Sequence, residues 1–388
     1  MLQESQPDGA VLSARTPAAR LRILHVLLQA GPTNSQWNEH CVPVADERDL
    51  TVCSLFPATV APDPRITRFE GDGSVWGALE ALRASLRAAD YDAVHVHAPP
   101  SAAMLVAACA LERRRLGNAV MTLHTTWPDL RLRSKMLAVA AFAVLPTVVA
   151  CGRASSESIP RPVRHLARRG VDVVPNGVDV DRLDRALATV EPEAGHVRDG
   201  RAVGGFTVLT VGRLVPEKDH EALLSAFARM SRPTDRLLIV GEGPCRPALE
   251  ERIATLGITD QVRLTGLMPR DDVYRLLGSA DVFVSPSRGE GLPVAVLEAM
   301  AAGLPVVLSD IEPHREIVGG QDLAAVVPIG DVAGLADEMR RLRSLAARER
   351  AALGARGRAR VLGEFSLRAM TDGYHEVYST ITTARRTQ

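Results

Sequence analysis

Short apolar runs that alternate with helical patterns limit the fold of this chain more than any other feature. Strand-like runs lie at Arg22–Leu28, Leu50–Leu55, Ala93–His97, Ala119–Leu123, Thr147–Cys151 and Val171–Val174, and again at Phe206–Val211, Arg236–Val240, Gln261–Thr265, Asp281–Val284 and Pro305–Leu308. Strands that alternate with helices form βαβ units, whose strands are parallel and whose helices cover the sheet. The sequence therefore predicts an α/β fold.

A break between the two series of strands predicts two domains. Residues 191–205 (EPEAGHVRDGRAVGG) are rich in glycine and charge, as linkers are. We expect a loose tail at 1–19, an N-terminal Rossmann-like domain at 20–195 and a second one at 205–365. Doubly wound sheets bind ligands at the carboxyl ends of their strands. The site is therefore expected in a cleft across which the two domains face each other.

Composition argues against several classes of function. The formal net charge is zero, which gives nucleic acid no attractive surface field. Five cysteines are scattered without a CxxC pair, as in a protein of the reducing cytoplasm. The longest apolar stretch, Met136–Cys151, contains Pro146 and is shorter than the roughly 20 residues of a bilayer-spanning helix. We expect a cytoplasmic protein without a transmembrane helix.

The segment Gly212–Asp219 (GRLVPEKD) carries the first candidate residues. It follows a predicted strand and precedes a predicted helix, so Arg213 and Lys218 fall at the edge of the sheet. Arginine offers phosphate a planar pair of donors, and lysine offers a point charge. The chain has only two lysines against 44 arginines, so a lysine inside a motif is a specific feature. We favour phosphate binding here over an ordinary solvated loop.

A second segment, Ser285–Pro293 (SPSRGEGLP), leads into an apolar helix predicted over Val294–Ala302. Its glycines allow a ligand to approach the backbone closely, and a helix N-terminus is a natural seat for a diphosphate. Glu290 stays on the loop, whereas Glu298 lies within the helix, where a carboxylate needs hydrogen-bonding partners. Sugar or ribose hydroxyls would serve, and a bond to a neighbouring side chain is the alternative.

These segments resemble the retaining glycosyltransferases of family 4, which have the GT-B fold of two facing Rossmann-like domains. GRLVPEKD, GEGP (Gly241–Pro244) and GEGLPVAVLEAMAAGLPVV match the family's motifs, and Glu290 and Glu298 have the spacing of its E-x7-E pair. The similarity extends to VPNGVD (Val174–Asp179), VHVHAPP, TLHT and FSLRAMTDGYHEVY, so it covers most of the chain.

The resemblance implies roles for the matching residues. Arg213 and Lys218 would hold the donor diphosphate and stabilise it as it leaves, Glu298 would bind ribose, and Glu290 would bind the transferred sugar. The amides of Gly291 and Leu292 would bind phosphate or sugar, and Gly31 would approach the phosphate. Leu267 and Met268 would line the base pocket. His97 would face the reacting centre, and His124 would lie on the acceptor side. The C-terminal helix, 366–388, would cross back onto the first domain, anchored by Tyr374 and Tyr378.

The loop after the first strand departs from the family, because it has Gly31 alone where members often carry a Gly-Gly pair. Trp37, Asn38 and His40 on this loop could meet an acceptor, or they could simply pack the loop. Asn34 or Ser35 would cap the helix that follows.

No metal and no cofactor are expected. Asp179-Val180-Asp181 has the DxD form that binds a metal in another glycosyltransferase fold, but no further carboxylates are placed to complete an oxygen-rich shell. The alternative for His97 is a core histidine bonded to backbone. His25 has no motif around it, and we assign it no role.

Charge is uneven in one place, since residues 113–169 hold eleven basic residues and two acidic ones. A solvated face is the default interpretation. The alternative is a surface for anionic lipid, at the inner face of a membrane, or for a phosphorylated acceptor.

The predicted function is transfer of a hexosyl unit, with retention, from a UDP- or GDP-linked sugar to a hydroxyl acceptor that can be lipid-linked. Such a reaction belongs to glycolipid, polysaccharide or glycoconjugate synthesis. Two alternatives stand beside it. A GT-B sugar-nucleotide epimerase would need additional acid and base carboxylates in the cleft. A catalytically silent partner subunit would not need Arg213, Lys218 and Glu290 to be intact, and all three are present.

Overall fold

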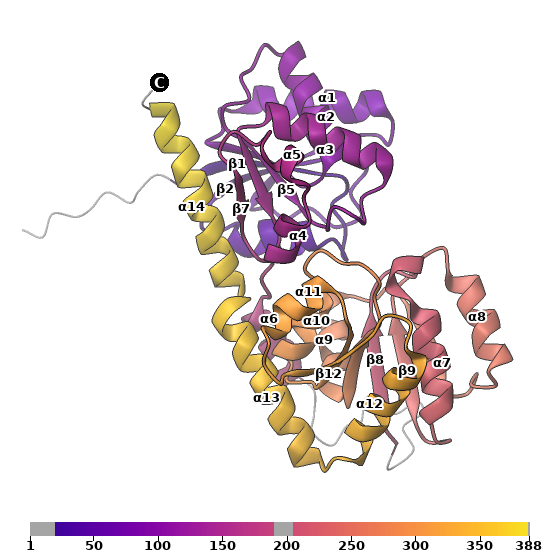
Figure 1. The fold of residues 1–388 in the computed structure, drawn as a ribbon. Coiled ribbons are helices and arrows are strands. Elements are labelled where there is room, and N and C mark those ends of the chain that lie inside the picture. The colour runs from indigo at the N-terminus through magenta and orange to yellow at the C-terminus, as the bar shows by residue number, and fades with distance from the viewer. Residues whose placement is uncertain (1–19, 190–204, 387–388) are drawn as a thin grey trace, which may run out of the picture.

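The computed structural model describes residues 20–189 and 205–386, which form two separate parallel sheets (Figure 1). Residues 191–204 of the predicted linker and the tail at 1–19 lie outside the described residues. The first sheet has the order β3-β2-β1-β4-β5-β6-β7 and the second the order β10-β9-β8-β11-β12-β13. The strands are β1 (Arg22–Leu27), β2 (Asp49–Ser54), β3 (Ile66–Glu70), β4 (Ala93–Val96), β5 (Ala119–Leu123), β6 (Thr147–Ala150), β7 (Val171–Val173), β8 (Thr207–Val211), β9 (Arg236–Val240), β10 (Val262–Gly266), β11 (Val282–Ser285), β12 (Val306–Ser309) and β13 (Ala324–Val327).

Helices connect the strands and flank both sheets, which is why the central strands are apolar on both faces. In α1, for example, Ser74 caps the first turn by accepting from the amide of Gly77 at 2.9 Å, and Ala78, Leu82 and Leu86 face the core at helical spacing. The helices are α1 (Val75–Ala88), α2 (Pro99–Leu111), α3 (Leu132–Val144), α4 (Arg153–Glu157), α5 (Arg161–Arg164), α6 (Val180–Ala188), α7 (His220–Met230), α8 (Arg246–Thr255), α9 (Arg270–Ser279), α10 (Val294–Ala301), α11 (Glu312–Val318), α12 (Val332–Ser344), α13 (Ala347–Glu364) and α14 (Leu367–Arg386), with short turns η1 (Gln36–Cys41), η2 (Val42–Val44) and η3 (Pro216–Lys218).

Each sheet has one point at which the strand order reverses. In the first sheet it lies between β1 and β4, and in the second between β8 and β11. Loops that leave two neighbouring parallel strands in opposite directions open a crevice at their carboxyl ends, where doubly wound folds bind ligands. The segments Gly212–Asp219 and Ser285–Pro293 follow β8 and β11, so they border this point in the second sheet.

The chain crosses between the two halves at two adjacent places. Before the second sheet begins, Val180, Leu183 and Ala186 of α6 already pack into the core of that sheet. At the other end of the chain, α14 buries Tyr374 and Tyr378 in the core of the first sheet. The amide of Val178 donates to the Phe365 carbonyl at 2.9 Å, and the amide of Leu367 donates to the Val178 carbonyl at 2.8 Å. The N-terminal half therefore ends near Val178, whereas the sequence analysis placed its end at residue 195.

All eleven predicted strands are present, and two further strands were not predicted. Both lie at the edges of their sheets: β3 is half polar, and β13 is short and rich in alanine. Among residues 20–189 and 205–386, no helix combines the length and the apolar character that crossing a bilayer requires.

Candidate functional site

An ion pair joins the two loops at the reversal point of the second sheet. The Nζ atom of Lys218 lies 2.5 Å from Oε1 of Glu290, and Ser287 donates its hydroxyl to the same oxygen at 2.7 Å. The amide of Arg288 donates to the Glu217 carbonyl at 2.8 Å, which fixes the loops to each other. Lys218 and Glu290, predicted from separate motifs, are thus in direct contact.

Arg213 differs from Lys218 in having no ionic partner. Its side chain is exposed directly after β8, and within residues 20–189 and 205–386 it makes no salt bridge. A guanidinium at this edge of the sheet can therefore accept an anion without first breaking an internal ion pair.

Glu298 is buried on α10 and is bonded by protein side chains. Tyr274 donates to its Oε1 atom at 3.0 Å, and Arg270 forms an ion pair with the same oxygen. Burial raises the pKa of the Tyr274 hydroxyl, so this group remains a donor. In this structure Glu298 is therefore bonded to neighbouring side chains, which was the alternative given in the sequence analysis. Both bonds are made to Oε1, and neither involves Oε2.

Arg270 also ties the two halves together. It lies at the start of α9, and its Nη2 atom forms ion pairs with both Glu298 and Glu39, which is on η1 in the N-terminal half. One guanidinium thus serves two buried carboxylates. Burial, together with the charge of Glu298 and despite Arg270, raises the pKa of Glu39 to about 8.

The loop of the second motif also packs directly on the N-terminal half. A Cβ atom on Gly291 would lie 2.2 Å from the carbonyl oxygen of His124, so only glycine allows this approach. Asn176 donates to the Leu292 carbonyl at 2.9 Å and fixes the same loop from the side. The residue after Glu290 is therefore in contact with the end of β5.

Histidines cover the facing edge of the first sheet. His97 follows β4, and its Nδ1 and Nε2 atoms lie 3.0 Å from Nε2 of His124 and 2.9 Å from Nδ1 of His25. His40 on η1 stands edge-on to His97, with ring centroids 4.9 Å apart. Burial lowers the pKa of His124 to about 4 and that of His97 well below its usual value, so these rings are neutral at pH 7.

Two residues predicted for the acceptor side make contacts within the N-terminal half. Trp37 is 5% exposed and packs in the core of the first sheet. The amide of Asn38 donates to the carbonyl groups of Pro32 and Asn34. The structure therefore favours loop packing for both, and Asn34 caps the turn by accepting from the Trp37 amide at 2.7 Å.

The remaining candidates lie around these loops. Gly31 is buried beside Thr59, Leu267 is 58% exposed just before α9, and Met268 packs partly against the core of the second half. Asp179 accepts from the amide of Arg182 at 2.9 Å and caps α6.

Sequence reasoning missed Glu39, Arg270, Tyr274 and His25. Arg270 and Tyr274 stand next to the segment assigned to the base pocket, and their i, i+4 spacing was an available signal. Glu39 and His25 carry no local signal, because their partners lie 231 and 72 residues away in the sequence.

Comparison with known proteins agrees with this geometry. Residues 205–344 match the family described as "Glycosyl transferases group 1", and residues 45–182 match "Glycosyltransferase Family 4". The 2-deoxystreptamine N-acetyl-D-glucosaminyltransferase of Streptomyces fradiae is 31% identical over 298 residues, which are 71% of this chain and 70% of that protein. The chain belongs to the group 1 glycosyltransferases of family 4.

Two further relatives match this chain over shorter parts of its length. The 2-deoxystreptamine glucosyltransferase of Streptomyces kanamyceticus is 34% identical over 45% of this chain, and the match spans about half, 46%, of that relative. The phosphatidyl-myo-inositol mannosyltransferase of Mycobacterium leprae is 31% identical over 64% of this chain and 63% of its own length.

Solved structures show that the fold is GT-B. The crystal structure of Anabaena Alr3699/HepE in complex with UDP and glucose has a TM-score of 0.75 at 18% identity, covering 93% of this chain and all of that one. Sucrose-phosphate synthase from Thermosynechococcus elongatus has a TM-score of 0.77 at 18% identity, covering 94% of this chain and 100% of that one. Two Rossmann-like units facing each other were expected from the sequence, and this prediction is confirmed.

The carboxylate pair around Arg270 predicts a specific pH dependence of stability. Glu39 has a pKa of about 8 in the fold against 4.5 as a free side chain, so the folded protein holds a proton that the unfolded chain releases. The contribution of Glu39 to the free energy of unfolding should therefore fall as pH rises from about 4.5 to 8. Glu39→Gln cannot ionise, and its stability relative to wild type should rise across this interval and level off above it.

Urea unfolding of both proteins at pH 5, 7 and 9 measures this difference. The control is Glu47→Gln, an exposed carboxylate in the same half, whose difference from wild type should not change with pH. Parallel pH profiles for Glu39→Gln and wild type would contradict the assignment.

Proposed function

We propose that this chain transfers a hexosyl unit from a nucleotide-diphosphate sugar to a hydroxyl acceptor with retention of anomeric configuration. The observation that carries the proposal is the ion pair of Lys218 with Glu290 at the reversal point of the second sheet, where Arg213 follows β8 and the Glu290 loop touches the carbonyl of His124. A cationic pair suits a diphosphate, and the loop beside it suits the sugar.

Charge neutralisation of the leaving diphosphate is the main protein contribution in this proposal. Arg213 makes no ion pair with any residue that the structure describes, and Lys218 is held by Glu290 at 2.5 Å. A phosphate that takes Lys218 releases a Glu290 oxygen for hydroxyls of the transferred sugar. Fixed cations aimed at developing charge stabilise a transition state without a metal ion, so no divalent cation is required.

The nucleoside is assigned to α9 and α10. Both protein partners of Glu298 bond to Oε1, which leaves Oε2 for ribose hydroxyls. Leu267 and Met268, next to α9, would line the base, and the amides of Gly291 and Leu292 would seat phosphate or sugar. Titles of similar structures name UDP and UDP-glucose, and a UDP-hexose is therefore the first donor to test.

Retention fits the neutral histidines opposite the donor. His97 and His124 do not supply a carboxylate nucleophile, and their lowered pKa values make them hydrogen-bonding groups rather than strong bases. In the proposed reaction the diphosphate leaves on the face at which the acceptor hydroxyl enters, and a donor phosphate oxygen takes the acceptor proton.

The acceptor class is suggested by the relatives. Several carry names with 2-deoxystreptamine or phosphatidyl-myo-inositol, and both are hydroxylated cyclohexane rings. We therefore propose a cyclitol hydroxyl as the first acceptor to test, in free or lipid-linked form.

A thermal-shift screen with UDP-, GDP- and ADP-sugars tests donor binding. One nucleotide sugar at 100 times its Kd should stabilise the protein by about 2.7 kcal/mol, and Arg213→Ala should lose most of this gain. The control is Arg229→Ala, an exposed arginine on α7, which should keep it. Absence of any shift would refute the donor site as described.

Removal of divalent metal tests the charge neutralisation by Arg213 and Lys218. Turnover should survive EDTA. Activity that is abolished by EDTA and restored by Mg²⁺ or Mn²⁺ would refute the donor site as described.

The two glutamates of the E-x7-E motif should have separable kinetic effects. Glu290→Gln should lower kcat by about 10²-fold with little change in donor affinity, because misplacing the sugar affects the transition state. Glu298→Gln should mainly raise KM, because ribose contacts change little during the reaction. Steady-state kinetics measure both, with exposed Glu251→Gln on α8 as the matched control. Normal turnover by Glu290→Gln at saturating donor would place the sugar elsewhere.

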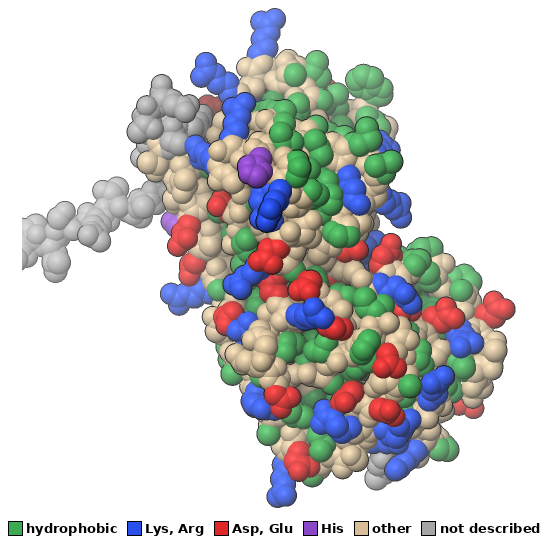
Figure 2. All heavy atoms as spheres, in the orientation of Figure 1, with side chains coloured by type: hydrophobic (Ala, Val, Ile, Leu, Met, Phe, Trp, Pro, Cys, Tyr) green, Lys and Arg blue, Asp and Glu red, His purple; other side chains and the backbone are tan. Residues whose placement is uncertain are grey.

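We also propose that the protein binds peripherally at the inner face of a membrane. Helix α3 exposes Leu132 and Met136 beside Arg131 and Arg133, and Figure 2 shows apolar and basic side chains together on this half of the molecule. Each basic residue near an anionic surface contributes about 1 kcal/mol.

Sedimentation with vesicles tests this location. The protein should sediment with anionic vesicles and not with neutral ones, and salt should weaken binding. Joint substitution of Arg131 and Arg133 by Glu should reduce it, whereas the same change at exposed Arg263 and Arg348 of the other half should not. Equal sedimentation with both vesicle types would contradict this location.

A further inference from the structure

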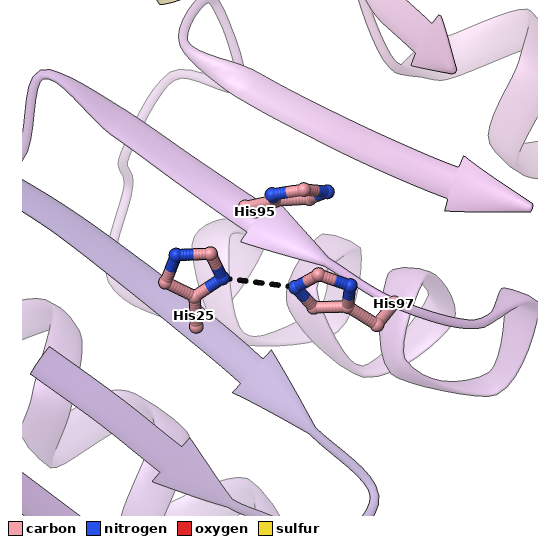
Figure 3. A group of neighbouring side chains, drawn as sticks. All are labelled: His25, His95 and His97. Atoms are coloured by element: carbon pink, nitrogen blue, oxygen red, sulfur yellow. Dashed lines mark hydrogen bonds between the residues drawn. The ribbon is translucent and has the colours of Figure 1, made fainter. Parts of the chain in front are cut away.

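Five buried or half-buried histidines meet at the carboxyl edge of the first sheet. They come from strands and loops far apart in the sequence, and they are His25, His40, His95, His97 and His124. Figure 3 shows three of them, with the hydrogen bond between His25 and His97. The His95 and His97 rings are stacked with centroids 4.0 Å apart. A packed core does not require so many imidazoles in one place.

We propose that His40, His97 and His124 bind a borderline transition-metal ion such as Zn²⁺. One ring nitrogen from each lies within 4.8 Å of the other two. Nδ1 of His97 and Nε2 of His124 are 3.0 Å apart, close to the ~3.3 Å that separates two ligands of a tetrahedral zinc with Zn–N bonds of about 2.0–2.1 Å. Three imidazoles with an open fourth position are an established zinc-binding set.

Hydrogen bonds distinguish this set from the second group, His25, His95 and His97, which also meets the distance criterion. Both nitrogens of His95 are taken by hydroxyl groups, Tyr378 at 2.7 Å and Thr122 at 2.7 Å. The His40 ring makes no hydrogen bond within residues 20–189 and 205–386. A metal at the first set therefore displaces fewer existing contacts.

His25 is placed to orient His97 as a ligand. Its Nδ1 atom faces Nε2 of His97 at 2.9 Å. If His97 donates its Nε2 proton to His25, the lone pair of Nδ1 points toward His40 and His124. Metal-binding histidines usually donate the second ring N–H in this way. Burial also keeps the His40, His97 and His124 rings neutral, which is the form that binds metals.

The ion would occupy the edge that faces the donor loop, because His124 lies against Gly291. It would therefore compete with the acceptor and slow transfer. This consequence rests on the proposed function, whereas the binding of the ion does not.

Metal binding is tested on the untagged full chain after dialysis against EDTA. Zn²⁺ alone is titrated in competition with a chromophoric chelator. We expect one ion per chain with a micromolar or lower Kd, and at least a tenfold weaker Kd for His40→Ala and for His124→Gln. The control His375→Ala, exposed on α14, should bind as wild type does. Circular dichroism of the metal-free variants checks their folding. If His40→Ala unfolds, the Kd of His124→Gln is the deciding measurement, because His124 is less buried than His40.

The outcomes separate the two proposals. Absence of stoichiometric binding, or equal affinity in wild type and His124→Gln, overturns the metal site. With Co²⁺ in place of Zn²⁺, intense visible absorption of a four-coordinate ion supports the site, and the weak absorption of a six-coordinate ion overturns it. Zn²⁺ that binds at these histidines without slowing transfer overturns the acceptor position and leaves the metal site intact.

Discussion

Parallel pairing of all strands is the constraint from which the site follows. A parallel sheet directs every strand's carboxyl end to the same edge, and the connecting helices must then cover both faces. In each half the strand order reverses once, between β1 and β4 and between β8 and β11. Side chains on the loops that follow those strands therefore lie close together, although no local sequence signal places them there. Histidines lie at one edge, cations and a carboxylate lie at the other, and the two edges touch where Gly291 packs on His124.

Acidic and basic side chains at this meeting place are bonded to each other. Lys218 holds Glu290, and Arg270 holds Glu298 and Glu39 from opposite halves. Removing an ion from water costs several kcal/mol unless a partner compensates. The pairs join the two loops and the two halves, and a ligand group that bonds to one of these side chains replaces a contact that already exists. Arg213 is the exception, and it can make the first contact with an anion.

Much of the fold could be predicted because its information is local. Strands such as β9 are apolar after the first residue, and the segments around Arg213 and Glu290 carry their own turn and helix signals. Edge strands β3 and β13 were missed because half-polar or alanine-rich runs lack that contrast. The contacts of Arg270 with Glu39 and of His97 with His25 could not be predicted, since Glu39 and His25 reach their partners only through the tertiary fold. Trp37 shows the opposite limit: its position in a loop suggested a ligand contact, and burial in the core explains it better.

The paired crossings at Val178 and Ser366 define which pieces of the chain can be exchanged between relatives. Helix α6 precedes the second sheet in sequence but belongs to its core, and α14 follows that sheet but belongs to the core of the first. A chimera joined between residues 190 and 204 would pair α6 of one parent with α9 and α10 of another, and would give α14 a foreign surface. Junctions at the two crossings keep each helix with its own core. The two halves are thus recombined as intact units only by cutting the chain twice, at positions that are neighbours in space.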